Sequence, residues 1–254
     1  AATEWQNRPL DSLYMIVWMD GIVFKVRENG KVINKTVYLC VGLNKEGLKE
    51  VLGMWIGKNE SAAFWMGVLT DLKARGVEDI LITVTDNLNG FTETIKSVFP
   101  ASTTQICVVH QIRNSCRYVV WKEKKEFTAD LKNIYNAPTK EAAEMELDNF
   151  EQKWGAKYPY AIRSWRNNWE ELTVFFDFPV EIRKIIYTTN LIENLNGKIR
   201  KYTKNKLSFP NDDALKKSVY LAINEIEKKW YQPIWNWALI FNQFITIFEN
   251  RIQV

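Results

Sequence analysis

Leu13-Tyr14-Met15-Ile16-Val17-Trp18-Met19-Asp20, near the start of the chain, is an unbroken run of seven apolar residues that ends in a carboxylate. A run this short and rich in β-branched and aromatic side chains predicts a strand buried on both faces. A second stretch, Ile80-Leu81-Ile82-Thr83-Val84-Thr85-Asp86, repeats the pattern. If the two strands are neighbours, Asp20 and Asp86 face each other. Two adjacent carboxylates repel, so a divalent cation would be their natural partner.

Each aspartate on its own also fits a simpler interpretation. A carboxylate at the end of a strand is often solvated or begins a turn, and Asp20-Gly21 is itself a hairpin signal. A metal site therefore depends on both aspartates together and on further acidic residues elsewhere in the chain.

Composition limits the class of protein. With 254 residues, 46% of them hydrophobic, the chain can form one large domain or a core with a substantial insertion. A net charge of +4 permits a nucleic-acid partner without demonstrating one. Three cysteines without disulfide-framework spacing indicate a reducing compartment. The polar start is no signal peptide, no apolar run is long enough to span a membrane, and the missing initiator Met suggests a fragment.

The first part of the chain shows the element order of an α/β fold. Residues 13–57 predict three antiparallel strands, Ser61 is suited to cap the helix that follows, and a strand then leads to Asp86. A helix over residues 91–98 and a strand over residues 103–109 complete the pattern. The order β-β-β-α-β-α-β predicts a mixed five-stranded sheet flanked by helices.

Beyond residue 110 the strand signals disappear. Helical patterns rich in aromatic residues predict an all-α insertion with an aromatic core, and Thr139 is suited to cap one of its helices. Tryptophans in such a pattern, Trp121 among them, fit a core better than a base-stacking platform. Three more helices are expected afterwards. The predicted division is a first core segment in residues 10–110, the insertion in 111–180 and the rest of the core in 181–254.

A third carboxylate, Glu193, opens a helical pattern with an apolar stripe and a polar stripe. The apolar stripe consists of Leu191, Leu195, Ile199 and Tyr202. The polar stripe consists of Glu193, Asn196, Gly197, Arg200 and Lys204. Asn190 as N-cap with Glu193 three residues later also fits a capping box, which needs no function for Glu193.

Two further features of this helix suggest a binding function. Gly197 costs about 1 kcal/mol relative to alanine inside a helix, which suggests close approach by another backbone. Five cations follow Glu193 before the next acid: Lys198, Arg200, Lys201, Lys204 and Lys206. They fit binding to a phosphate backbone beside a metal site, and they also fit a solvated basic face.

Several segments together resemble one family, the Mutator-type bacterial insertion-sequence transposases. The segments are residues 84–91 (VTDNLNGF), 105–114 (QICVVHQIRN), 185–196 (IIYTTNLIENLN), 229–234 (KWYQPI) and 237–248. They occur in the family's order and cover nearly the whole chain. Asn87 and Asn194 are mild departures from the family pattern, and neither removes a ligand.

The resemblance implies a ribonuclease H-like catalytic domain with an Asp-Asp-Glu triad on Asp20, Asp86 and Glu193, interrupted by a helical insertion. It implies two bound divalent ions, Mg²⁺ or Mn²⁺, metal-dependent cleavage of element ends, and strand transfer by the freed 3′-hydroxyl. The expected partners are DNA, as transposon ends and target, and a second copy in a homodimer on DNA. No membrane partner is expected, and the expected location is the bacterial cytoplasm. A DNA-binding region is expected upstream of residue 1.

The resemblance also assigns the remaining candidate site residues. Asn196, Lys198, Arg200, Lys201 and Lys204 are expected to bind DNA. Cys107 and His110 match a small motif of the family and are expected to support the active site. Zinc at this pair would need two more ligands, and a Cys-His nucleophile would need a third orienting group, which the sequence does not indicate.

Two other functions remain open from the sequence. A metal-dependent nuclease could use the same triad without strand transfer. A domesticated DNA-binding protein is the non-enzyme alternative, although binding alone does not require three carboxylates.

Overall fold

The computed structural model describes residues 1–58, 61–188 and 191–253. The chain divides into two compact units, which are described separately. Unit 1 comprises residues 1–104 and 190–254, and unit 2 comprises residues 105–189. The division into 10–110, 111–180 and 181–254 stays a prediction.

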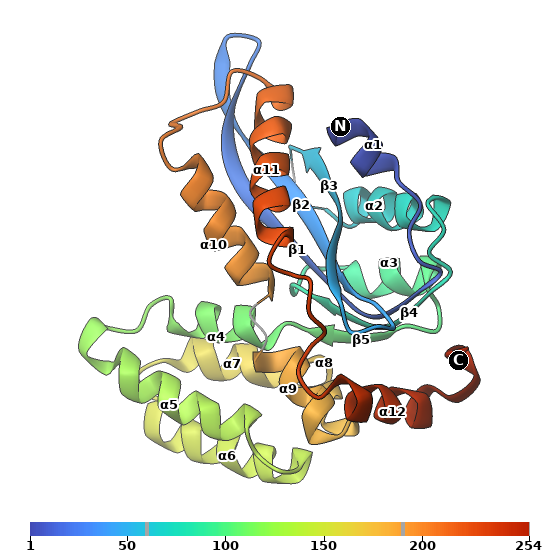
Figure 1. Ribbon diagram of the computed structural model, residues 1–254. Coiled ribbons are helices and arrows are strands. Elements are labelled where there is room, and N and C mark those ends of the chain that lie inside the picture. The colour runs from blue at the N-terminus through green and yellow to red at the C-terminus, as the bar shows by residue number, and fades with distance from the viewer. Residues whose placement is uncertain (59–60, 189–190, 254) are drawn as a thin grey trace. The chain divides into compact units, whose positions relative to one another are not determined.

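A five-stranded sheet forms the centre of unit 1 (Figure 1). Its strands are β1 (Leu13–Glu28), β2 (Lys31–Leu43), β3 (Lys49–Gly57), β4 (Asp79–Thr85) and β5 (Thr103–Ile106). The spatial order is β3-β2-β1-β4-β5, with β1 to β3 antiparallel and β4 parallel to β1. The expected α/β architecture, a mixed five-stranded sheet flanked by helices, is confirmed.

Two strand boundaries differ from the prediction. Strand β1 does not end at Asp20, because β2 continues to pair with it and places Leu39 opposite Asp20. The chain turns at Asn29 and Gly30, where the sequence Glu28-Asn29-Gly30-Lys31 predicts a turn, and their φ angles of 52° and 77° suit a tight hairpin. Strand β5 ends at Ile106 rather than at residue 109, because Cys107 accepts a bond from the amide of Gln111 and a helix begins.

Helices cover the sheet on both faces. Helices α2 (Ala62–Ala74) and α3 (Phe91–Val98) pack on one face, where Trp65 and Phe91 stack within the core. Helices α10 (Leu191–Thr203) and α11 (Asp212–Glu227) pack against β1 and β3 (Figure 1). Ser61 caps α2 as predicted, since its hydroxyl accepts from the amide of Phe64 at 3.1 Å.

Two further helices complete unit 1. They are α1 (Ala2–Asn7) and α12 (Trp237–Phe248). The start of α12 is held by the turn between β2 and β3, where Gly47 has a φ of 80° and a Cβ would lie 2.6 Å from the Trp237 ring. The Trp237 indole donates to the carbonyl of Lys45 at 2.8 Å. Only glycine combines that backbone angle with that close approach.

Unit 2 is helical throughout its described residues beyond the end of β5. Its helices are α4 (Val108–Cys116), α5 (Lys124–Tyr135), α6 (Lys140–Trp154), α7 (Pro159–Asn167), α8 (Trp169–Leu172) and α9 (Val180–Thr188), with short 3₁₀ turns η1 (Trp121–Glu123) and η2 (Val174–Asp177). Thr139 caps α6 as predicted. Because α9 begins at Val180, the stretch after residue 180 holds one helix more than the three expected.

The aromatic core expected for this region is present in unit 2. Phe127 lies at its centre, with the rings of Phe150, Trp154 and Tyr158 packed edge-on around it. The expectation was wrong for Trp121, whose side chain is 87% exposed. Its place in η1, between two helices, removes it from the helical stripe that faces the core.

Within the described ranges, no helix has both the length and the apolar character needed to cross a membrane.

Candidate active site

Asp20 and Asp86 lie together on the sheet of unit 1. Parallel pairing places Trp18 of β1 opposite Val84 of β4, so the residues two positions further on are neighbours on the same face. Carboxylate oxygens of Asp20 and Asp86 lie within 4.8 Å of each other. The expected convergence of the two strands and their aspartates is therefore found, with Asp20 buried and Asp86 half-buried.

Hydrogen bonds hold both carboxylates. Asp20 Oδ1 accepts from the amide of Gly21 at 2.8 Å, and Asp20 Oδ2 accepts from Asn196 Nδ2 at 3.0 Å. Asp86 Oδ1 accepts from the amide of Asn87, also at 2.8 Å. Donors directed at these oxygens fix the orientation of the two carboxylates.

The contact from Asn196 turns one face of α10 toward β1. Glu193 lies one helical turn before Asn196 and shares this face. Its Oε1 is shielded from solvent. Among the described residues, however, Glu193 is not one of three carboxylates within 4.8 Å of one another. Glu193 as third ligand stays a prediction, and the alternative capping box involves Asn190, which lies outside the described residues.

The oxygen donors suit a hard divalent cation. Mg²⁺ and Mn²⁺ prefer carboxylate and amide oxygens as ligands. Asp20 and Asp86 supply two carboxylates whose oxygens lie within 4.8 Å of each other. Asn196 Oδ1 is buried without a hydrogen-bond partner among the described residues, although its Nδ2 bonds Asp20. A buried acceptor in that position fits a hydrogen bond from water on a cation held by Asp20.

The predicted DNA-binding cations lie along the exposed side of α10. Lys198, Arg200, Lys201 and Lys204 all face solvent. The Arg200 guanidinium lies 5.8 Å from the ring centroid of Phe24 on β1, which supports its stem. Their role in DNA binding stays a prediction. Asn196, expected among them, donates a hydrogen bond to Asp20, and its role in DNA binding also stays a prediction.

Two expectations for α10 were wrong. Tyr202 is 57% exposed and leaves the apolar stripe, while Thr203 is buried and donates its hydroxyl to the carbonyl of Ile199. A Cβ on Gly197 would meet no described atom within 4 Å, so none of the described segments makes the close approach that was expected. The open space at Gly197 lies beside the predicted DNA-binding cations.

Lys49, at the start of β3, is a candidate site residue that no sequence pattern indicates. Burial, together with the charge of Lys198, lowers the pKa of Lys49. Its ammonium lies 5.1 Å from the ring centroid of Trp230 in the connection after α11. Lys49 therefore lies close enough to Lys198 of α10 for the two charges to interact.

Cys107 and His110 lie in unit 2. Cys107 is half-buried at the start of α4, and His110 is buried in its first turn. Support of the active site by this pair stays a prediction. All three cysteines are free thiols.

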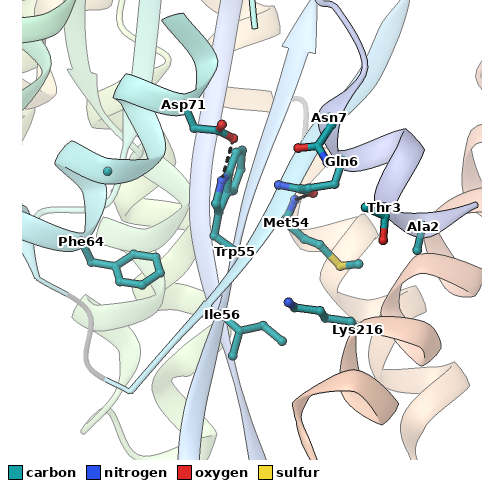
Figure 2. Close-up of a pocket in the computed structure, with 11 residues that line it drawn as sticks. Ala2, Thr3, Gln6, Asn7, Met54, Trp55, Ile56, Phe64, Asp71 and Lys216 are labelled. Carbon is teal, nitrogen blue, oxygen red and sulfur yellow. Dashed lines mark hydrogen bonds between the residues drawn. The ribbon is translucent and has the colours of Figure 1, made fainter. Parts of the chain in front are cut away.

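A pocket of about 530 Å³ lies elsewhere in unit 1, between α1, β3, α2 and α11 (Figure 2). Figure 2 shows Trp55 and Asp71 at its wall, where the indole donates to the carboxylate at 3.0 Å. Strand β3 forms the opposite edge of the sheet from β4 and β5. The pocket is therefore separate from the aspartate pair.

Comparison with known proteins identifies the family. A family model described as "Transposase, Mutator family" matches residues 1–233. The chain belongs to the Mutator family of transposases.

Individual relatives agree with this assignment. This Mutator-family chain is 44% identical over 252 residues to the transposase for insertion sequence element ISRM3 of Rhizobium meliloti, covering 99% of this chain and 63% of that protein. It is 42% identical over 226 residues to a probable insertion-sequence transposase of Corynebacterium diphtheriae, covering 89% and 66%. The chain thus spans less than two thirds of each relative's length.

Among solved structures, the Mos1 transposase catalytic domain with raltegravir and magnesium is 16% identical, covering 63% of this chain and 82% of that chain. The TM-score of 0.24 is too low for this likeness to support an argument.

Proposed function

We propose that this chain is the catalytic domain of a DNA transposase that cleaves phosphodiester bonds at element ends and joins the freed 3′-hydroxyl to target DNA. One observation carries the proposal: a chain of the Mutator family brings Asp20 and Asp86 within 4.8 Å on neighbouring strands. Its substrates would be transposon ends and target DNA. We further propose a homodimer on DNA and a bacterial cytoplasmic location.

Asp20, Asp86 and Glu193 are the proposed ligands of two divalent ions, Mg²⁺ or Mn²⁺. Such ions, when bound, activate an attacking water or hydroxyl and stabilise the oxygen that leaves. The two aspartates come from adjacent strands, and Glu193 comes from the helix that Asn196 joins to Asp20.

The chain's own groups would orient this chemistry. Gly21 and Asn196 hold both oxygens of Asp20, and the amide of Asn87 holds Asp86. Exposed cations on α10 would bind the phosphate backbone and fix its register without reading sequence. Cys107 and His110 would support the site from unit 2.

A nicking and joining assay tests the proposal. Supercoiled plasmid with Mg²⁺ or Mn²⁺ reports cleavage, and a labelled oligonucleotide with a free 3′-hydroxyl reports strand transfer. Asp20→Asn, Asp86→Asn and Glu193→Gln should each abolish both reactions. Asp213→Asn removes one exposed carboxylate on α11 and serves as the charge-matched control.

The outcomes separate the rival functions. Wild-type activity in Asp20→Asn or Asp86→Asn would overturn the proposed site. Metal-dependent nicking without joining would indicate a nuclease. Binding to DNA without either reaction would indicate a DNA-binding protein.

A further inference from the structure

Trp121 stands out on unit 2 because its side chain is 87% exposed. Two neighbours along the chain are also exposed, Tyr118 at 65% and Val120 at 45%. Single exposed apolar side chains are ordinary, but three within four residues concentrate exposed apolar surface in one short segment, which suggests a binding partner. The patch lies in the connection between α4 and α5 (Figure 1).

The backbone that carries Trp121 is held in place. Tyr158 accepts a hydrogen bond from the amide of Val120, and Tyr160 accepts one from the amide of Tyr118, each at 3.3 Å. The Tyr160 hydroxyl in turn donates to the carbonyl of Ser115 at 2.8 Å. The segment before Trp121 is therefore tied at two points, and the ring is presented on an ordered support.

Tyr158 also ties the segment after Trp121, since its hydroxyl donates to Glu123 Oε1 at 2.9 Å. The edge-on contact between Tyr118 and Tyr160, with centroids 5.3 Å apart, adds a further support. A ring on an ordered backbone segment binds a flat ligand with less loss of conformational entropy than one on a mobile loop.

The charges around these rings are positive. Arg117 lies with its guanidinium 5.5 Å from the ring centroid of Tyr118, and Lys122 and Lys125 face solvent. The nearby acids are already engaged: Glu123 pairs with Lys157, and Glu126 pairs with Lys153 at 2.7 Å. We name the set Arg117, Tyr118, Trp121, Lys122 and Lys125 the aromatic-basic surface.

We propose that the aromatic-basic surface binds unpaired bases of DNA, in a single strand or displaced from a duplex. The inference rests on the proposed function only in taking DNA as the ligand. Aromatic rings would stack on base faces, and the three cations would contact the adjacent phosphates. Bases in an intact duplex are already stacked, so an open indole face suits bases that have left the stack. Lysines are depleted in protein–protein interfaces, but tryptophan, tyrosine and arginine are enriched there, so a protein partner is the rival outcome of the test.

Binding of the full chain to three labelled DNAs tests the proposal by fluorescence anisotropy. The DNAs are an intact duplex, the same duplex with an unpaired bulge, and one of its strands alone. Trp121→Ala should weaken binding to the bulged duplex and the single strand by about 5- to 150-fold, as expected for one lost base stack. Binding to the intact duplex should change by less than about twofold, and Trp121→Phe should retain most of the affinity.

The matched control is Trp235→Ala. Trp235 is 86% exposed in unit 1, in the connection before α12, and lies outside the aromatic-basic surface. This variant should bind all three DNAs as the wild type does. Because Trp121 is exposed, its variants should melt at the wild-type temperature, so a change in binding would not reflect unfolding.

Three results would overturn the proposal: unchanged binding of Trp121→Ala to every DNA, equal weakening on all three DNAs, or a change in oligomeric state by light scattering in place of a change in DNA binding. The last result would indicate a protein partner. Plasmid cleavage by Asp20→Asn separates this proposal from the proposed function. If Asp20→Asn loses plasmid cleavage and Trp121→Ala binds all three DNAs as the wild type does, only the base-binding surface is overturned. If Asp20→Asn still cleaves plasmid and Trp121→Ala selectively loses binding to the bulged duplex and the single strand, only the proposed catalytic site is overturned.

Discussion

Asn196 Nδ2 donates a hydrogen bond to Asp20 Oδ2 over 3.0 Å, joining residues that are 176 positions apart in the sequence. This bond links helix α10 to strand β1 at the aspartate pair. It also orients the face of α10 that carries Glu193, one turn earlier. Asn196 is therefore a positioning residue for Asp20.

Replacing Asn196 should impair metal binding. Asn196→Ala removes a donor to Asp20, and loss of such a partner of a metal ligand costs about 10- to 100-fold in metal affinity or activity. A titration of plasmid nicking against Mg²⁺ should show the midpoint shifted to higher concentration. Asn194→Ala, at an exposed position on α10, is the control and should titrate as the wild type. Equal midpoints for both variants would show that Asn196 does not position Asp20.

Replacing Asp20 should leave the metal-free fold at least as stable as the wild type. Two carboxylates within 4.8 Å repel, and Asp20→Asn removes one charge while keeping the shape. Asn196 can turn its amide so that Oδ1, which has no hydrogen-bond partner among the described residues, accepts from the new amide. Differential scanning fluorimetry without metal should give an equal or higher melting temperature for the variant.

The same measurement with metal isolates binding. Mg²⁺ or Mn²⁺ should stabilise the wild type by about 2.7 kcal/mol at a hundredfold excess over Kd, and the variant by much less. If metal-free Asp20→Asn melts well below the wild type and gains as much from metal, Asp20 has a structural role and the proposed site is wrong.

The exposed cations of α10 should bind phosphates without selecting sequence. Arg200→Ala or Lys201→Ala should weaken binding to unrelated duplexes alike and reduce the slope of log K against log salt by about one. Lys216→Ala, on α11 at the pocket shown in Figure 2, removes one exposed cation away from α10 and should keep the wild-type slope. A selective loss for one duplex would instead indicate that the mutated residue reads bases.

Glu227 should make the fold less stable as the pH rises through the weakly acidic range. Burial raises the pKa of Glu227 from 4.5 to about 6, and the carboxylate accepts only a long bond of 3.4 Å from the amide of Val51. A carboxyl whose folded-state pKa is raised is more easily ionised when unfolded. Stability should therefore fall between pH 4.5 and about 6 and then remain level.

Glu227→Gln removes this cost. Its unfolding free energy near neutral pH should exceed that of the wild type by up to about 2 kcal/mol, with no gain at pH 4. Urea unfolding at both pH values measures the difference. Glu225→Gln, at an exposed position on the same helix, should show no comparable gain. A gain that is equal at both pH values would contradict the assignment to ionisation of Glu227.

Local patterns carried enough information to predict the elements that lead to the aspartates. The apolar runs before Asp20 and Asp86 predicted neighbouring buried strands, and Ser61 predicted the start of α2. These features depend on side-chain alternation and on hydrogen bonds that span a few residues, so they are visible in a short stretch of sequence. The motif order in addition indicated the family.

Contacts between segments that are distant in the sequence could not be predicted from such local patterns. Asp20 lies within β1 because Leu39 of β2 pairs with it. Asn196 donates a hydrogen bond to Asp20 because α10 packs on β1. Trp121 is exposed because it falls in a 3₁₀ turn whose neighbouring amides are taken by Tyr158 and Tyr160. Helical periodicity states which residues share a face, but the burial of that face depends on the partner that packs against it.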